Sequence, residues 1–189
     1  MEGQEETTGM AHAPRCSGKE ANQICRECIQ EALIRLLRTK DLDQITISEL
    51  VKTAGVSRTT YYRNYYNKED VLKDLFDSLM AEVATAIATA PDDHAAFVAF
   101  FECIQENAEV YLVLQKANYT LSELDEITRI TSADTPEDHV IDRTRLAFVA
   151  GGLFNVARIW LENGAVETPE EMAGRYEEVL QDPLKERSA

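Results

Sequence analysis

The side chains best suited to chemistry are hydrogen-bond donors and aromatic rings gathered in residues 58–66, which read Arg-Thr-Thr-Tyr-Tyr-Arg-Asn-Tyr-Tyr. Arginine can donate two hydrogen bonds to guanine, threonine and tyrosine can contact thymine methyl groups, and hydroxyl or amide groups can hold phosphates. Because Tyr61 and Tyr65 are four residues apart, we expect both rings to pack inward and Tyr62 and Tyr66 to face outward. These residue types favour nucleic-acid recognition over catalysis.

Cys25 and Cys28 form a second candidate site, with the Cys-x-x-Cys spacing of metal and redox pairs. The sequence offers no second cysteine pair and no nearby histidine at zinc spacing. With Cys16 close by, a redox switch stays open, and the alternative is a small core residue beside an exposed thiol. The three histidines are scattered, and no phosphate loop or nucleophile elbow is present. We therefore expect no metal site, no cofactor and no enzyme activity.

The net charge of −15 disfavours nucleic acid by itself, but the charge is unevenly distributed. Residues 33–68 contain seven basic residues and three acids, a net charge of +4, so the rest of the chain carries −19. A basic patch on an acidic protein suits one anionic partner bound at one end. A solvated helical face can show the same imbalance by chance.

The composition favours an all-α protein, because 44% of residues are hydrophobic and only 8 glycines and 5 prolines interrupt the chain. Residues 1–10 lack the features of a signal peptide. The longest late uncharged run, residues 146–157, is shorter than the roughly 20 residues that span a bilayer. We expect a cytoplasmic protein with no membrane partner.

Apolar spacing and capping residues predict about nine helices and no strand. Thr46, Ser57 and Asn67 are expected N-caps, and Gly55 is expected to end a helix in the left-handed conformation. The expected organisation is a disordered leader (1–19), a first helical domain (20–66) and a second helical domain (67–185). The helices are expected over 20–39, 46–54, 57–65, 67–90, from 91 through 104, 110–117, 140–163 and from 168, with a polar loop over 118–139.

Two of these helices, 46–54 and 57–65, are joined by a tight turn at Gly55 and Val56, which is a helix-turn-helix pattern. The second helix of such a motif can enter the major groove, which is wide enough to admit it. The alternative is a helical hairpin with a polar exposed face. Four tyrosines within six residues favour the DNA-binding interpretation.

The run from Ile45 to Leu72, with Ala-Gly-Val-Ser, the Thr-Tyr-Tyr segment and Lys-Glu, resembles the signature of the TetR family, and the resemblance extends over residues 22–80. It implies that residues 20–66 form a DNA-binding domain and residues 67–185 a ligand-sensing and dimerisation domain. It also implies that Arg58 and Thr59 face base edges and that Tyr62 lies at the boundary of base and phosphate contacts. Backbone phosphates are expected to be held by Thr60, Arg63 and Asn64. Tyr66 departs from the small or polar residue usual there. The DNA-binding residues that the resemblance implies are Ser48, Arg58, Thr59, Thr60, Tyr62, Arg63, Asn64 and Lys68, the lysine holding a phosphate at a helix N-terminus.

The segment from Phe148 to Met172 is similar to a Firmicutes-type subgroup of that family, which implies dimerisation through the last two long helices. The expected dimer interface is Gly152, Trp160, Leu161, Met172, Tyr176 and Val179. A ligand cavity is expected along Phe97, Phe101, Tyr111, Leu114, Tyr119 and Phe154. For both sets the alternative is an ordinary intrachain core.

Together these features predict a regulator, a repressor released by an unknown small-molecule effector. Two recognition helices one DNA turn apart would read a palindromic operator in double-stranded DNA, which requires a homodimer. An alternative is a TetR-like interaction or co-activator subunit acting through a protein partner, favoured by the acidic second domain and Tyr66. An enzyme on a helical scaffold is the least supported class.

Overall fold

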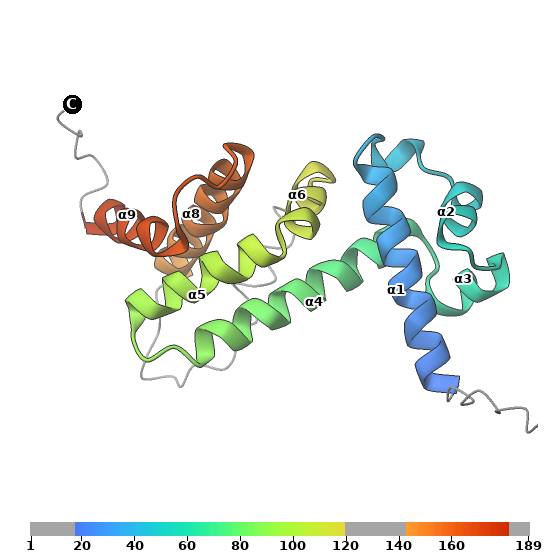
Figure 1. Ribbon diagram of the computed structural model, residues 1–189, viewed down its shortest axis with the longest axis horizontal. Coiled ribbons are helices and arrows are strands. Elements are labelled where there is room, and N and C mark those ends of the chain that lie inside the picture. Colours follow the sequence, from blue (N-terminus) through green and yellow to red (C-terminus); the bar gives the residue numbers. More distant parts are fainter. Residues whose placement is uncertain (1–17, 120–142, 182–189) are drawn as a thin grey trace, which may run out of the picture.

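The computed structural model describes residues 18–119 and 143–181, and this part of the chain contains helices and no strands (Figure 1). This confirms the all-α prediction. The helices are α1 (Gly18–Leu37), α2 (Ile47–Ala54), α3 (Arg58–Asn64), α4 (Lys68–Ala88), α5 (Asp93–Glu106), α6 (Ala108–Lys116), α8 (Arg143–Glu162) and α9 (Pro169–Gln181), with a 3-10 helix, η1 (Leu42–Gln44), between α1 and α2.

Helices α2 and α3 begin and end where their capping residues predict. The Thr46 side chain accepts a hydrogen bond from the Glu49 amide at 3.2 Å, and the Ser57 side chain accepts one from the Thr60 amide at 3.0 Å. Gly55 has a φ of 68°, which L side chains rarely adopt, and this glycine therefore stops α2. The turn between the two helices is thus determined by residues within the turn itself.

The first three helices and the start of α4 enclose one core, in which Ile29, Leu33, Leu50, Tyr61 and Leu72 are almost fully buried. Helix α1 contacts α2, α3 and α4. The sequence reasoning missed η1, because a single 3-10 turn has no apolar periodicity; its signal is the reciprocal pairing of the Asp41 and Gln44 side chains with each other's backbone.

Helix α4 runs through both halves of the molecule, and α5 returns alongside it (Figure 1). Helix α5 packs against α4 on one side and α9 on the other, while α6 contacts α1, α4 and α8. A second aromatic cluster lies here, where Phe101 packs edge to face against Phe100 and Trp160 with ring centroids 5.4 and 5.6 Å away. Because α4 contacts α1 in one half and α5 and α6 in the other, it connects the two halves.

The described helix bounds lie close to those predicted, and residues 140–142, predicted to begin the long helix that contains α8, lie outside the described residues. Gly164, with a φ of 87°, follows the end of α8. The predicted leader and the predicted polar loop lie almost entirely outside the described residues. Within the described part of the chain, no helix combines the length and apolar character needed to cross a membrane.

A histidine bridge joins α5 to α9. The Nδ1 atom of His94 lies 3.0 Å from a Glu177 carboxylate oxygen, and its Nε2 atom lies 3.0 Å from a Glu170 carboxylate oxygen. Neutral imidazole has one N–H, so only the protonated ring can donate to both carboxylates. The hydrogen bonds to Glu170 and Glu177 accordingly raise the pKa of His94 above its usual value.

This bridge predicts a pH-dependent contribution to stability. Since the pKa is higher in the folded state, the stabilisation is fully present below the unfolded-state pKa and is lost as the pH rises through the folded-state pKa. We expect His94→Ala to lower the melting temperature more at about pH 5.5 than at about pH 8.5, as measured by circular dichroism. An equal decrease at both values would contradict the bridge.

Candidate DNA interface

The recognition-type helix α3 presents one face to the core and the opposite face to solvent. Tyr61 is fully buried and Tyr65 is 3% exposed, whereas Tyr62 is 53% exposed and Tyr66 is 89% exposed. The sequence prediction for the four rings is therefore confirmed. The Tyr61 hydroxyl donates to the Asn67 carbonyl at 2.8 Å, and burial raises the pKa of Tyr61 to about 12, so the group stays a donor at neutral pH.

The two residues expected to read bases lie at the exposed start of α3. Arg58 and Thr59 are both exposed, and the Arg58 guanidinium donates to the Ser48 hydroxyl at the start of α2. The structure therefore brings together three predicted site residues from two helices. Because its hydroxyl holds the guanidinium, Ser48 can orient Arg58 before any base is contacted.

The residues expected to contact phosphates differ in solvent exposure and in their hydrogen bonds within the protein. Tyr62 and Arg63 are exposed, and the Tyr62 ring packs edge to face on Tyr61 with centroids 5.3 Å apart. Thr60 and Asn64 are half-buried: the Thr60 hydroxyl lies 2.9 Å from that of Ser57, and the Asn64 amide donates to the Thr60 carbonyl at 2.9 Å. Tyr62 and Arg63 are therefore the more accessible of these side chains.

Lys68 forms hydrogen bonds within the protein. Its ammonium donates to the carbonyls of Leu42 and Ile45 at 2.6 and 2.7 Å, and the residue is half-buried. Since an ammonium has three donors, one N–H remains for another partner. The main contact of Lys68 in this structure is thus a tie between the start of α4 and the segment before α2, which sequence reasoning did not anticipate.

The positive charge that remains at the α2–α3 surface is concentrated on a few residues. Arg38 pairs with Glu109 and Lys40 pairs with Glu49, which neutralises part of the basic window. Lys52, Arg58 and Arg63 lie on α2 and α3 and are exposed. An anionic ligand would therefore meet its cations on the surface that carries Tyr62.

The six residues expected to line a ligand cavity all belong to or pack against one hydrophobic core, and they differ in the rings that they contact. Phe101, Tyr111, Leu114 and Phe154 are buried, and the Tyr111 ring stacks on that of Phe154 with centroids 6.2 Å apart. The other two contact different rings: Phe97 packs against Tyr176 and Tyr119 against Phe76.

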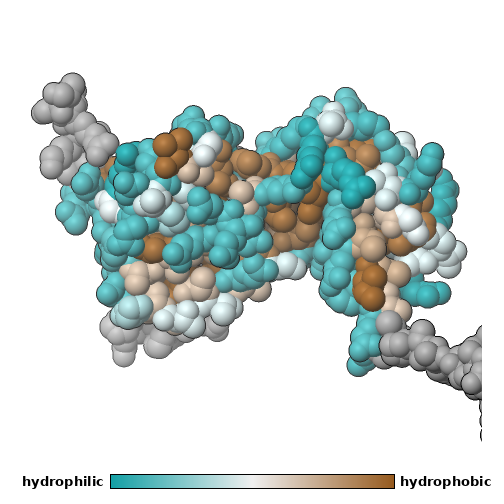
Figure 2. Space-filling view, viewed as in Figure 1, coloured by the Kyte–Doolittle hydropathy of each residue, from teal (hydrophilic) through white to brown (hydrophobic). Residues whose placement is uncertain are grey.

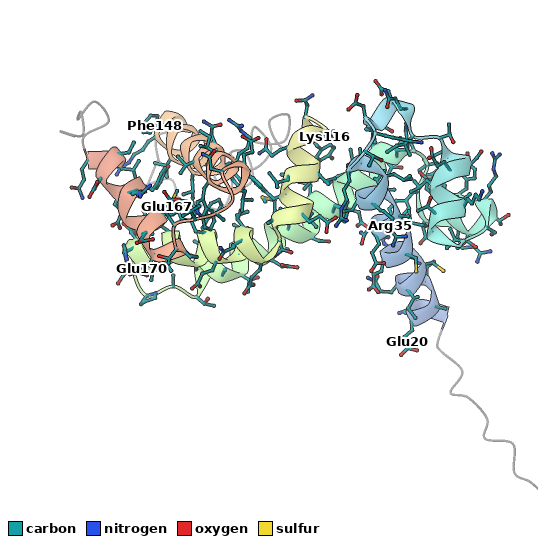
Figure 3. All side chains as sticks on the ribbon, turned by 45° about the horizontal axis from the view of Figure 1, so that its top comes forward. Glu20, Arg35, Lys116, Phe148, Glu167 and Glu170 are labelled. Carbon is teal, nitrogen blue, oxygen red and sulfur yellow. The ribbon has the colours of Figure 1, made fainter. Side chains whose placement is uncertain are left out.

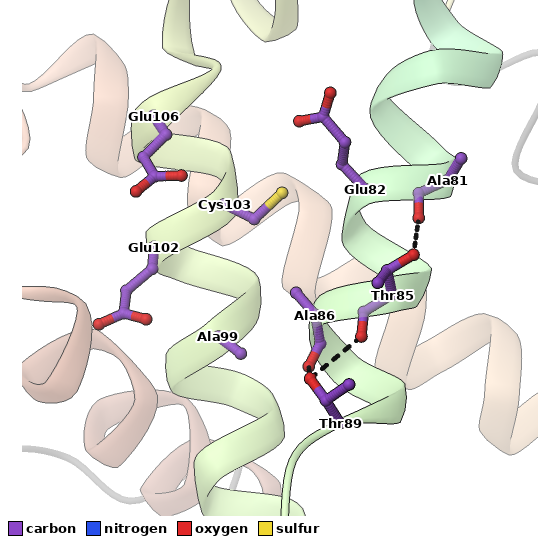
Figure 4. Close-up of a pocket in the computed structure, with 9 residues that line it drawn as sticks. All are labelled: Ala81, Glu82, Thr85, Ala86, Thr89, Ala99, Glu102, Cys103 and Glu106. Atoms are coloured by element: carbon purple, nitrogen blue, oxygen red, sulfur yellow. Dashed lines mark hydrogen bonds between the residues drawn. The ribbon is translucent and has the colours of Figure 1, made fainter.

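A separate groove of about 630 Å³ lies between α4 and α5 and is lined by other residues (Figure 4). Its floor has small side chains such as Ala86 and Ala99, and Glu82, Glu102 and Glu106 stand at its sides. Such a groove offers little apolar area to a drug-sized ligand. Cys103 borders it and belongs to the core, as predicted.

Most residues expected at a dimer interface are buried within the single chain. Trp160, Leu161, Met172 and Tyr176 are each at most 9% exposed. The Trp160 indole donates to the Glu167 carbonyl at 3.1 Å, and the Tyr176 hydroxyl donates to the Val149 carbonyl. Gly152 faces the Tyr176 ring, where an added β-carbon would lie 3.2 Å from the hydroxyl oxygen. Of the six, Val179 is exposed.

The remaining candidates from the sequence form no site in the described structure. Cys25 and Cys28 are half-buried free thiols on α1, and Cys16 lies outside the described residues. Within residues 18–119 and 143–181, no group of three His, Cys, Asp or Glu side chains is placed to hold a metal ion.

The fold and the α2–α3 surface define a helix-turn-helix protein. Residues 29–75 match the profile of the family described as "Bacterial regulatory proteins, tetR family". The chain is 34% identical over 71 residues to YxbF of Bacillus subtilis (strain 168), an uncharacterized HTH-type transcriptional regulator, and 37% identical over 62 residues to the HTH-type transcriptional regulator EthR of Mycolicibacterium smegmatis.

These two matches cover 36% and 33% of this chain but only 19% and 29% of those relatives. A crystal structure of a putative TetR-family regulator from Syntrophomonas wolfei superposes with a TM-score of 0.64 at 17% identity, covering 88% of this chain and all of that one. That likeness shows the fold of the chain, and the likeness to TetR-family sequences lies in the helix-turn-helix part, residues 29–75.

Proposed function

We propose that this protein is a TetR-type transcriptional regulator, a homodimer that binds a palindromic DNA operator in the cytoplasm and is released from it by a small molecule. The observation that carries the proposal is the exposed face of α3, a helix that Ser57 caps at its N-terminus. The exposed side chains on this face are Arg58, Thr59, Tyr62 and Arg63. A surface with two exposed arginines and an exposed tyrosine suits the major groove.

We assign the base-reading role to Arg58 and Thr59, and we infer that Ser48 orients Arg58 through their hydrogen bond. The remaining proposed DNA contacts are to the backbone, from Thr60, Tyr62, Arg63, Asn64 and the one uncommitted N–H of Lys68. We further propose that residues 20–66 form the DNA-binding unit and residues 67–185 the sensing and dimerisation unit. Helix α4, which starts at Lys68 directly after α3, couples them.

The test is binding of the full chain to the DNA upstream of its own gene, followed by footprinting. We expect a protected inverted repeat whose half-sites are about one helical turn apart, and affinity that falls steeply as salt rises. No protection at low salt would overturn the proposal.

We propose that the dimer forms through the outer face of α8 and α9. Exposed apolar side chains gather there: Phe148 and Ile159, three helical turns apart on α8, together with Val166 and Val179. Val166 is 83% exposed, and it lines a cavity of about 440 Å³ with Ile159 and Met172. Figure 2 shows hydrophobic atoms exposed at this end of the molecule, and Figure 3 shows Phe148 on α8. Exposed apolar patches of this kind mark association surfaces.

This interface predicts that Ile159→Glu separates the subunits. Burying a carboxylate in an apolar interface is unfavourable by about 2 kcal/mol or more. We therefore expect the dimer to be at least about 30-fold weaker, as measured by sedimentation velocity. Ile24→Glu is the matched control, because Ile24 is also exposed but lies on α1. Equal dissociation of both variants, or of neither, would contradict the assignment.

We propose that an effector acts through the aromatic cluster around Tyr111 and through α6. Helix α6 contacts α8 at one side and α1 at the other. Lys116, at the end of α6 (Figure 3), donates to the Leu37 carbonyl in the last turn of α1 at 2.8 Å. Glu109, at the start of α6, pairs with Arg38. Figure 2 shows apolar surface in the recess between α6 and α1. Movement of α6 would thus be transmitted to the DNA-binding half.

A further inference from the structure

The carboxylate of Asp74, on α4, accepts three hydrogen bonds from side chains of two other segments. Asp74 accepts from the Arg26 guanidinium and from the Gln30 amide at 2.7 Å, both on α1, and from the Tyr65 hydroxyl at 2.6 Å. Its side chain is 22% exposed. Charge-assisted hydrogen bonds of this kind are the stronger ones in proteins. Asp74 therefore ties α1, the end of α3 and α4 together at one point.

Of the residues that contact Asp74, Tyr65 is the one at the end of α3, the helix proposed to contact DNA. It is the C-cap of α3, its ring is buried, and the Arg26 guanidinium lies 5.3 Å from the ring centroid. Burial, followed by the hydrogen bond to Asp74, raises the pKa of Tyr65 far above its usual value. The hydroxyl therefore remains a donor to the carboxylate.

A helix as short as α3 depends on such ties for its direction. It has 7 residues, and isolated helices of that length are not stable in water, so tertiary contacts must set its orientation. Two tyrosine hydroxyls anchor its inner face, one to the Asn67 carbonyl and one to Asp74. The first anchor is to adjacent backbone, whereas the second reaches α4.

We propose that Asp74 is a positioning residue for DNA recognition, which fixes the angle of α3 against α1 and α4 through Tyr65 and Arg26 without touching DNA. The proposal rests on the proposed function. It assigns a role to an acid beside a basic surface, where general electrostatics gives the opposite expectation: removing a negative charge should tighten binding to phosphates.

The two explanations predict opposite changes in DNA affinity when the negative charge of Asp74 is removed, so one substitution distinguishes them. Asp77 is the matched control, because it lies on the same helix three residues further along and pairs with Lys73 of that helix at 2.8 Å. We expect Asp74→Asn to weaken operator binding about 5- to 30-fold, and Asp77→Asn to leave it unchanged or tighter. Binding is measured by fluorescence anisotropy at a temperature where circular dichroism shows every variant folded.

Tyr65→Phe should weaken binding in the same direction. If the pair acts as a unit, its effect should not add to that of Asp74→Asn in the double variant. Full additivity, or tighter binding by Asp74→Asn, would overturn the proposal.

Hydrogen exchange in the free protein separates this inference from the proposed function. We expect Asp74→Asn to speed exchange of the α3 amides while those of α5 and α9 stay as in the wild type. This readout holds even if the wild-type chain binds no DNA, which would overturn the proposed function alone. Equal acceleration in all helices, or no change in α3, would show that Asp74 does not position α3.

Discussion

Arg58→Ala is expected to reduce operator affinity more than any other single substitution on the DNA-binding surface. A bidentate arginine–guanine contact contributes about 1–3 kcal/mol of discrimination, and a homodimer loses it in both half-sites. Affinity for the specific site should therefore fall at least about 30-fold. The exposed position of Arg58 and its hydrogen bond to Ser48 support this role, because the guanidinium is already held at the surface.

The measurement is titration of operator and unrelated DNA with wild-type and variant protein at fixed salt. Binding to unrelated DNA should change much less than binding to the operator, because sequence-independent affinity comes from the phosphates. Arg158→Ala is the control: it removes the same charge from α8, where Arg158 pairs with Glu162 at 2.7 Å. If both variants weaken operator binding alike, net charge explains the loss and Arg58 has no base-reading role.

Phe101→Ala is expected to destabilise the protein by about 3–5 kcal/mol, a large share of the 5–15 kcal/mol typical of folded domains. The ring is fully buried and packs edge to face on Phe100 and Trp160, so truncation leaves a cavity among aromatic rings. Urea unfolding followed by circular dichroism measures the loss, at one fixed subunit concentration because the proposed dimerisation would contribute to stability.

This experiment also distinguishes the two interpretations of the aromatic cluster. Tyr66→Ala is the control, since it removes a ring that is 89% exposed and should change stability by less than about 0.5 kcal/mol. A core residue gives the full loss without any ligand. If Phe101→Ala instead destabilises the protein only slightly, the ring borders space that a ligand can fill, and the ligand-cavity expectation gains support.

The sequence predicted the helix-turn-helix well because its signals are local. Thr46, Ser57 and Gly55 act on backbone groups within a few residues of themselves, and the spacing of Tyr61 and Tyr65 determines which face of α3 is buried. Such hydrogen bonds and periodicities are complete within one or two turns. The exposed surface for which we propose DNA binding could therefore be predicted from the sequence, without knowledge of any tertiary contact.

The partners of individual site residues were harder to predict. Lys68 was expected at a phosphate, but its ammonium reaches carbonyls 23 and 26 residues earlier in the chain. Asp74 has no distinguishing feature among the 34 acids of the sequence, and its role depends on α1 and α3 meeting at the same point of α4. Such pairs depend on where helices cross, and helical spacing does not specify that.

The sequence by itself determined the helical class, the motif and the two faces of α3, because each follows from interactions between residues close in the chain. Only the tertiary structure decided which apolar side chains serve the protein's own core. The family resemblance places Trp160, Met172 and Tyr176 at a dimer interface, and in the structure they are buried where α9 packs against α5 and α8. An apolar side chain gains free energy from any surface that excludes water, so its partner is decided by how distant helices pack.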